Sequence, residues 1–314
     1  MPVPRHPAPA PPPRDTALLV HLALVTVQLL FGANYVIAKV AFHEVSPEGL
    51  VLIRSVGAAL VLALALPFRR RDPARPRLTA REYGALFLYS LLGITINQAA
   101  FLEGLARSSA TNAAIILVMI PVVTLAFAVL LRRERASVVG TAGIGAGLVG
   151  ALLMILPRGG VTLSSTAVAG NLLLLLCASA YALYLVLARR ILARHDTLTV
   201  VVVMFVMSAI VLTPFGYAGV RDVARTGLTA AGWWSVTFVT LGATAAPYLL
   251  NGWALGRAKS SVVAVYVLLQ PIVAAVLGRI FLGERLGANA ALAATLIVGG
   301  VLATVWRPVR PVQA

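Results

Sequence analysis

Eleven uncharged polar side chains lie inside long apolar runs of this 314-residue chain, and their chemistry is that of binding. Amides, phenols and hydroxyls donate and accept hydrogen bonds, but they are costly in hydrocarbon unless they are paired or face a cavity. We predict that they line one central cavity for a small polar solute. The alternative is that they join neighbouring helices, at about 0.6–2 kcal/mol per contact. The eleven are Asn34, Asn97, Gln98, Thr111, Asn112, Tyr181, Tyr184, Tyr248, Asn251, Tyr266 and Gln270.

One cation, Arg54, also lies inside an apolar run, and we predict that Glu103 is its counter-ion. The ten acidic residues all lie in the N-terminal tail, in links or close to the ends of runs, so none is placed at mid-depth for a proton relay. This distribution favours a facilitator, or coupling by another route. Glu134 and Glu284 each precede a run, where we expect the carboxylate to stabilise the N-terminus of the next helix.

The residues needed for catalysis are sparse. Only His21 of the four histidines lies in an apolar run, and Cys177 is the single cysteine. Neither a zinc-protease pattern nor a nucleotide-binding G-x-x-x-x-G-K pattern occurs. We therefore expect no catalytic residue, no metal site, no cofactor and no direct use of ATP. A structural or sensory membrane protein is one alternative to transport, and a membrane-embedded enzyme is another.

The composition shows which elements must carry these residues. Hydrophobic residues make up 60% of the chain and charged residues 11%, against about 45–50% and about 25% in soluble domains. Without β-type alternation, the long runs predict an all-α integral membrane protein with ten transmembrane helices. A proline-rich N-terminal segment, 1–15, predicts a disordered tail. The runs are 17–41, 49–68, 83–105, 109–131, 138–156, 168–188, 198–217, 232–255, 261–282 and 287–306.

The net charge of +16 is explained by orientation in the membrane. Eighteen basic residues fall in the segments on the N-terminal side and seven on the opposite side. The positive-inside rule then places both termini in the cytoplasm of a multi-pass protein of the cell (inner) membrane. We expect no nucleic-acid partner.

An internal repeat relates the two halves of the chain. An offset of 150 residues brings Pro121, Glu134 and Arg135 onto Pro271, Glu284 and Arg285. We expect a first repeat over 16–157 and a second over 166–307, each with five spans. An odd number of spans inverts the second copy in the membrane, giving a 5+5 inverted-topology repeat and two states of similar energy. Pro121 and Pro271 are candidate hinges, whereas Pro247 has Asn97 as its counterpart, which is an asymmetry.

Two matched segments carry a family resemblance: ARSSATNAAIILVMIPVVTLAFAVLLRRER, from Ala106, and RAKSSVVAVYVLLQPIVAAVLGRIFLGER, from Arg257. With the ten spans, they resemble the EamA-type family of the drug/metabolite transporter superfamily. The resemblance implies a cavity bounded by helices 1, 3, 4, 6, 8 and 9, and transport of small metabolites, for which we expect export. This chain has Phe31 where that family often has tryptophan.

A run of small residues over 140–150 includes Gly143 and Gly147. Small residues four apart allow two helices to approach closely. We expect this run to be a scaffold contact, either within the bundle or at the seam of a homodimer.

Overall fold

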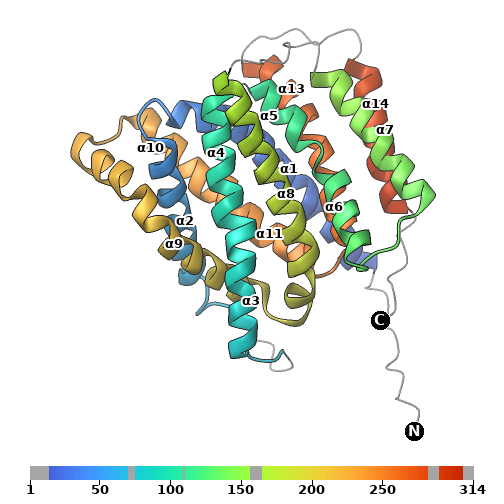
Figure 1. Cartoon of the computed structure of the whole chain (residues 1–314), viewed down its shortest axis with the longest axis horizontal. Helices are drawn as coiled ribbons and strands as arrows, with labels where there is room; N and C mark the ends of the chain where they lie inside the picture. Colours follow the sequence, from blue (N-terminus) through green and yellow to red (C-terminus); the bar gives the residue numbers. More distant parts are fainter. Residues whose placement is uncertain (1–13, 70–74, 109, 156–164, 282–289, 307–314) are drawn as a thin grey trace.

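The computed structural model describes residues 14–69, 75–108, 110–155, 165–281 and 290–306. Helices account for nearly all of them, and these ranges contain no β-strand (Figure 1). The all-α prediction is therefore confirmed. The tail expected over 1–15 lies almost entirely outside the described residues, and the first helix begins at Arg14.

Ten helical rods cross the described structure, five from each half of the chain. In the first half they are α1 (Arg14–Ala41), α2 (Pro47–Leu64), α3–η1–α4 (Ala80–Ser90, Leu91–Ile96, Asn97–Arg107), α5–α6 (Ala110–Leu117, Ile120–Leu130) and α7 (Val138–Ile155). In the second half they are α8 (Ser165–Arg194), α9 (Thr197–Thr226), α10–η3–α11 (Ala230–Thr237, Phe238–Ala245, Ala246–Leu255), α12–η4–α13 (Ser260–Val265, Tyr266–Leu269, Gln270–Phe281) and α14 (Ala290–Trp306).

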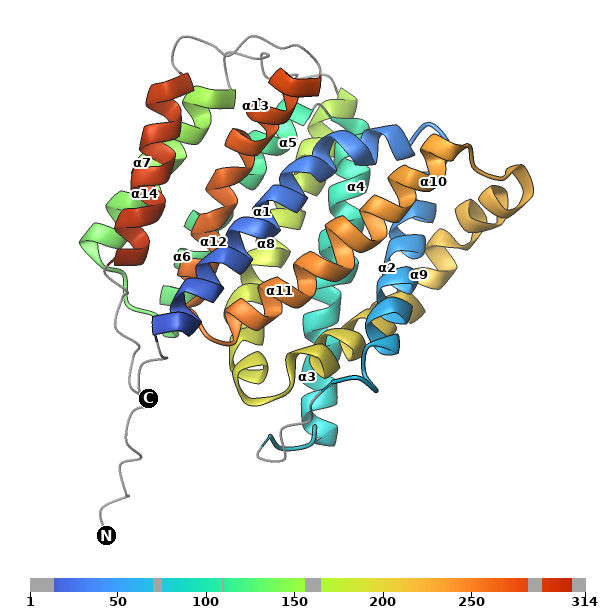
Figure 2. The ribbon, with the colours of Figure 1, turned by 180° about the vertical axis from the view of Figure 1, so that it is seen from behind.

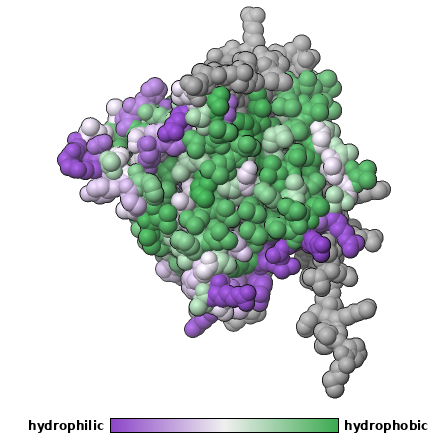
Figure 3. Space-filling view, viewed as in Figure 1, coloured by the Kyte–Doolittle hydropathy of each residue, from purple (hydrophilic) through white to green (hydrophobic). Residues whose placement is uncertain are grey.

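The surface of the bundle suits a bilayer. Six helices are long and apolar enough to span a membrane, and three shorter apolar helices accompany them among the residues searched. Large apolar side chains such as Leu64, Ile210 and Phe215 are about 70% exposed, which only a lipid environment would favour. Figure 3 shows the resulting hydrophobic band, with hydrophilic residues at its margins.

The packing follows an inverted two-fold relation. Helix α1 packs against α11 and α13, and its counterpart α8 packs in the same way against α4 and α6. The pairs α2–α9 and α7–α14 join elements that are equivalent under the repeat. Helix α1 begins on the lower side of the molecule and α8 on the upper side (Figures 1 and 2). The ten-helix inverted repeat is therefore confirmed.

The small-residue run of α7 is a contact within the bundle. A Cβ atom added at Gly143 would lie 2.8 Å from the carbonyl oxygen of Gly300, and one added at Gly300 would lie 2.4 Å from that of Gly143. The two backbones thus meet at a distance that only glycine allows. Of the two expected uses of the run, the contact with α14 is the one observed in this chain.

Several rods are interrupted near their middle. In the third and eighth rods the α-helix passes through a π-helical segment, η1 or η3. In the fourth rod a turn over 118–119 precedes Pro121, and in the ninth the 3₁₀ segment η4 precedes Pro271. The asymmetry between Pro247 and Asn97 is therefore confined to the sequence, since both residues follow a π-helical segment.

Candidate functional site

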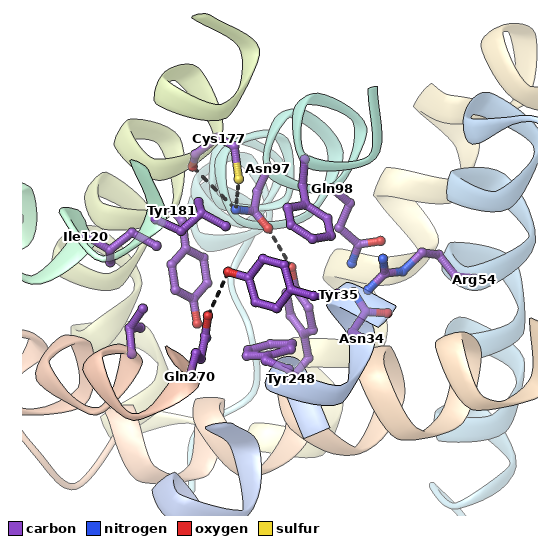
Figure 4. A pocket seen from close by; sticks show the side chains of 14 residues that line it. Asn34, Tyr35, Arg54, Asn97, Gln98, Ile120, Cys177, Tyr181, Tyr248 and Gln270 are labelled. Atoms are coloured by element: carbon purple, nitrogen blue, oxygen red, sulfur yellow. Dashed lines mark hydrogen bonds between the residues drawn. The ribbon is translucent and has the colours of Figure 1, made fainter. Parts of the chain in front are cut away.

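A pocket lies between the two repeats, with about 560 Å³ of atom-free space when the open space at its mouth is counted. It is lined from α1, α2, α4, α5, α6, α8, α11, η4 and α13 (Figure 4). Both halves of the chain therefore contribute walls. The lining residues are Phe31, Asn34, Tyr35, Arg54, Asn97, Gln98, Phe101, Leu117, Ile120, Cys177, Tyr181, Tyr248, Val267 and Gln270.

The helix interruptions bring the polar residues to the pocket. Asn97, Ile120 and Gln270 are the first residues of α4, α6 and α13, and Tyr248 lies in the first turn of α11. Each follows an interruption, where the normal i to i−4 hydrogen-bond ladder is broken. The interrupted backbone takes part in the site, because the Tyr248 hydroxyl donates to the carbonyl oxygen of Gly93, in η1, at 2.8 Å.

One wall of the pocket is a chain of hydrogen bonds across the repeat interface. The Tyr35 hydroxyl donates to Gln270 Oε1 at 2.9 Å, and Gln270 Nε2 donates to Gln28 Oε1 at 2.8 Å. These bonds tie α1 to the start of α13. They also satisfy polar groups that are at most 7% exposed, so this wall is held in place without a ligand.

A second group of hydrogen bonds in the pocket wall is built around Asn97. Its Nδ2 donates to the sulfur of Cys177 at 3.2 Å, and its Oδ1 lies 3.0 Å from the Tyr248 hydroxyl. Behind this wall, Asn251 Nδ2 donates to the Tyr181 hydroxyl at 3.0 Å. The amides of Asn97 and Asn251 therefore orient the phenols that face the pocket.

Aromatic rings make up much of the remaining surface. Tyr35 meets Phe101 edge to face with ring centroids 5.7 Å apart, and Phe31 meets Tyr248 at 6.4 Å. Phe205 supports Tyr248 from behind at 5.2 Å. Rings packed in this way give the pocket rigid apolar faces between its polar groups.

Arg54 lines the pocket and does not pair with Glu103, so the predicted ion pair is wrong. The Arg54 side chain donates from Nε to Thr244 Oγ1 at 2.7 Å and from Nη2 to the Ala243 carbonyl oxygen at 3.0 Å. Glu103 instead pairs with Arg107 at 2.8 Å, one turn along its own helix. The packing of α2 on η3 turns Arg54 toward η3 and the pocket rather than toward the end of α4.

The structure brings together six of the eleven predicted polar residues in the pocket: Asn34, Asn97, Gln98, Tyr181, Tyr248 and Gln270. Asn251 lies directly behind, bonded to Tyr181. Tyr184 packs its ring over Gly93, and the Tyr266 hydroxyl lies 2.6 Å from His21 Nδ1, so neither lines the pocket. The side chains of Thr111 and Asn112 lie outside the described residues.

Tyr35 as a pocket residue and Gln28 as the support of Gln270 were not predicted from the sequence. A usable signal was present, because Gln28, Phe31 and Tyr35 share one face of α1 at i, i+3 and i+7. For Arg54 the sequence predicted an ion pair, whereas the structure places it in the pocket lining.

The acidic residues outside the spans hold links together. Glu44 accepts from the backbone N–H and the hydroxyl of Thr229 at 2.7 and 2.6 Å, and these bonds lower the pKa of Glu44. Glu134 accepts from Ser260 and Ser261 at the start of α12. The expectation that Glu134 stabilises the next helix is wrong, because Ser137 fills that position at the start of α7. Glu284 lies outside the described residues.

Comparison with known proteins places the chain in a family. The model of the EamA-like transporter family matches residues 18–156 and again residues 168–306. The chain belongs to the EamA-like transporter family. These two matches coincide with the two halves of the bundle, and membership makes the protein a multi-pass membrane transporter.

Full-length relatives agree with this EamA-like assignment. An uncharacterized transporter of Archaeoglobus fulgidus is 27% identical, over 90% of this chain and 96% of its own. The uncharacterized transporter YoaV of Bacillus subtilis is 23% identical, over 90% and 95%. One solved structure has a TM-score of 0.73 at 18% identity and covers 94% of this chain and 98% of its own, which shows the fold.

Proposed function

We propose that the protein carries a small polar metabolite across the cell membrane by alternating access, with the pocket as its binding site. The observation that supports this most directly is the position of the pocket. It lies between two inverted repeats, and interrupted helices of both repeats supply its walls. Sites formed by interrupted helices at a repeat interface are typical of secondary transporters.

Equivalent contacts at the two faces of the bundle support the alternation. On one face, Glu44 accepts from Thr229, the cap residue of α10. On the other face, Thr79 caps α3, and its partner Glu82 lies 2.8 Å from His195 Nε2. Thr79 and Thr229 are related by the 150-residue offset, so the two contacts are candidates for opening in turn.

Pro121 and Pro271 are the proposed hinges of this movement. Each lies in the first turn of a half-helix that follows an interruption, and Ile120 and Gln270 beside them line the pocket. A bend at these points would change the pocket and the end of the rod together.

Orientation and direction complete the proposal. The excess of basic residues on the N-terminal side supports a position in the cell (inner) membrane with both termini in the cytoplasm. None of the ten acidic residues of the sequence falls in the middle of a span, which supports a facilitator, or coupling by a route other than a mid-depth carboxylate. A facilitator moves its substrate down the gradient, and a metabolite made in the cell therefore leaves it.

The test is an untargeted comparison of metabolites in cells and medium with and without the protein, followed by exchange assays in liposomes. We expect at least one small polar metabolite to build up in the medium and to exchange in liposomes. Exchange no faster than in protein-free liposomes, for every metabolite that differs, would overturn the proposal.

A further inference from the structure

One end of the pocket carries buried polar atoms that make no hydrogen bond of normal geometry with the described residues. They are Nη1 of Arg54, Oδ1 of Asn34, and both Nε2 and Oε1 of Gln98. The three side chains come from α2, α1 and α4, and each is at most 3% exposed. Figure 4 shows the Arg54 guanidinium reaching in beside Asn34 and Gln98. Because buried polar groups are normally paired, this cluster indicates a place for a ligand.

The charge of the cluster determines the kind of ligand. An amide can exchange its nitrogen and oxygen by turning, but a guanidinium is always charged and can only donate. None of the described lining residues is acidic, and the nearest carboxylate along α4, Glu103, pairs with Arg107. A buried cation without a counter-charge is unfavourable, and an anion bound beside it removes that cost.

The rest of the pocket determines the body of the ligand. Phe31, Tyr35, Phe101 and Tyr248 present ring surfaces, and Leu117 lies among them in the lining. These surfaces favour an apolar or aromatic group. The polar cluster and the rings belong to one pocket, so one small molecule can contact both.

We infer that the pocket binds a small organic carboxylate, with its carboxylate against Arg54 and Gln98 and its apolar body between the aromatic rings. The inference deepens the proposed function, since it concerns the same pocket, but it is a statement about binding and is tested without transport. A planar guanidinium matches a carboxylate through two parallel hydrogen bonds, which favours this anion.

A purely structural use of Arg54 makes a different prediction. Two of its N–H groups hold the π-helical segment η3 through Thr244 and Ala243. If that were its only use, the pocket would show no preference for anions. The preference is therefore the quantity to measure.

Cys177 gives a direct measurement, because it lines the pocket and is the single cysteine of the chain. The protein in nanodiscs of phosphatidylcholine is treated with two methanethiosulfonate reagents, one bearing a sulfonate and one bearing a trimethylammonium group. The ratio of their rates reports the local potential, because the thiol is common to both reactions. We expect the sulfonate reagent to be favoured and the ratio to fall about tenfold in Arg54→Gln.

Two variants control this measurement. Arg54→Lys keeps the charge, so its ratio should stay close to that of the native protein. Arg225→Gln removes an exposed cation from the last turn of α9, outside the pocket, and should leave the ratio unchanged. An unchanged ratio in folded Arg54→Gln would overturn the inference.

A second measurement applies even if Cys177 reacts with neither reagent or Arg54→Gln does not fold. Thermal unfolding of the native protein is followed with 3-phenylpropionate and with its neutral amide, 3-phenylpropionamide. We expect stabilisation by the carboxylate, with at least tenfold weaker binding of the amide. Equal effects of the two compounds, or stabilisation by phosphatidylglycerol but not by the carboxylate, would overturn the inference.

The two proposals fail separately. Binding of the carboxylate without exchange in liposomes would leave the inference standing and remove the proposed function. Exchange of neutral solutes with no preference for anions would leave the proposed function standing and remove the inference.

Discussion

The two repeats build the pocket from equivalent backbones but from different side chains. The 150-residue offset places Met204 opposite Arg54 and Tyr184 opposite Asn34. Met204 and Tyr184 are each 1% exposed and do not line the pocket, whereas Arg54 and Asn34 do. The proposed movement requires only the symmetry of the backbone. Binding one ligand in one orientation requires different side chains at its two ends, and this is where the repeats have diverged.

The largest loss of stability is expected when an arginine is placed at Met204, the position of the second repeat that is equivalent to Arg54. Met204→Arg would bury a guanidinium where the native side chain is apolar. The free energy of unfolding should therefore fall by more than about 3 kcal/mol. Met204→Leu, which conserves volume, should cost less than about 1.5 kcal/mol. Denaturant unfolding in nanodiscs measures both. Equal stabilities of the two variants would remove the contrast between the repeats.

A smaller loss of stability is expected at the glycine contact between α7 and α14, to which the two repeats contribute equivalent helices. A Cβ atom at Gly300 would lie 2.6 Å from the Gly147 nitrogen, so Gly300→Ala should destabilise the bundle by about 1–3 kcal/mol. A Cβ atom at Gly299 would meet no neighbouring segment of the described chain within 4 Å, so Gly299→Ala should be neutral or up to about 1 kcal/mol stabilising. Ligand binding to folded Gly300→Ala should be unchanged. Weaker binding there would show that the α7–α14 contact also shapes the pocket.

Substitutions at Gln98 and Asn251 distinguish a side chain that binds the ligand from one that stabilises the bundle. Gln98 makes no hydrogen bond of normal geometry with the described residues, so Gln98→Ala should leave stability nearly unchanged and weaken binding of 3-phenylpropionate about tenfold. Asn251 donates to Tyr181, so Asn251→Ala should cost about 1 kcal/mol of stability and weaken binding less. Thermal unfolding with and without the carboxylate measures both quantities. If both variants lose stability in step with binding, these amides only join helices.

The smallest effect is expected from a pH difference across the membrane. Exchange of 3-phenylpropionate in liposomes, corrected for protein-free liposomes, should change by less than about twofold when a pH difference is imposed. The reason is that no acidic residue lies at mid-depth and that Glu103 pairs with Arg107. Strict dependence on the pH difference that is lost in Glu103→Gln would identify Glu103 as a coupling site.

The site was predictable from the sequence where local rules are sufficient. Asn97, Tyr248 and Gln270 are polar residues in apolar runs, and the cost of burying them in hydrocarbon directs them inward whatever the neighbouring helix is. Tyr266 obeys the same rule but is satisfied by His21, on a helix 245 residues away in sequence. The rule therefore identifies polar side chains that need a hydrogen-bond partner inside the bundle. It does not say whether that partner is a ligand in the pocket or another side chain.

Arg54 and Glu134 show where the sequence was insufficient. Arg54 bonds to Thr244, 190 residues away, and Glu134 bonds to Ser260, 126 residues away. Spacing along the sequence alone predicts nearer partners, Glu103 for Arg54 and the next helix for Glu134. Which helix faces each charge depends on how the two repeats pack together, and the spacing within one repeat carries no information on that.

The sequence by itself determined the all-helical membrane fold, the ten runs and the inversion of the repeats, because hydropathy and the parity of spans act through the bilayer and need no partner. Only the tertiary structure decided that η1 and η3 interrupt equivalent rods, that Tyr35 and Arg54 enter the pocket, and that the polar atoms at one end remain unpaired among the described residues. These features depend on contacts between helices far apart in the chain. Such contacts are set by the close packing of the whole bundle rather than by any single span.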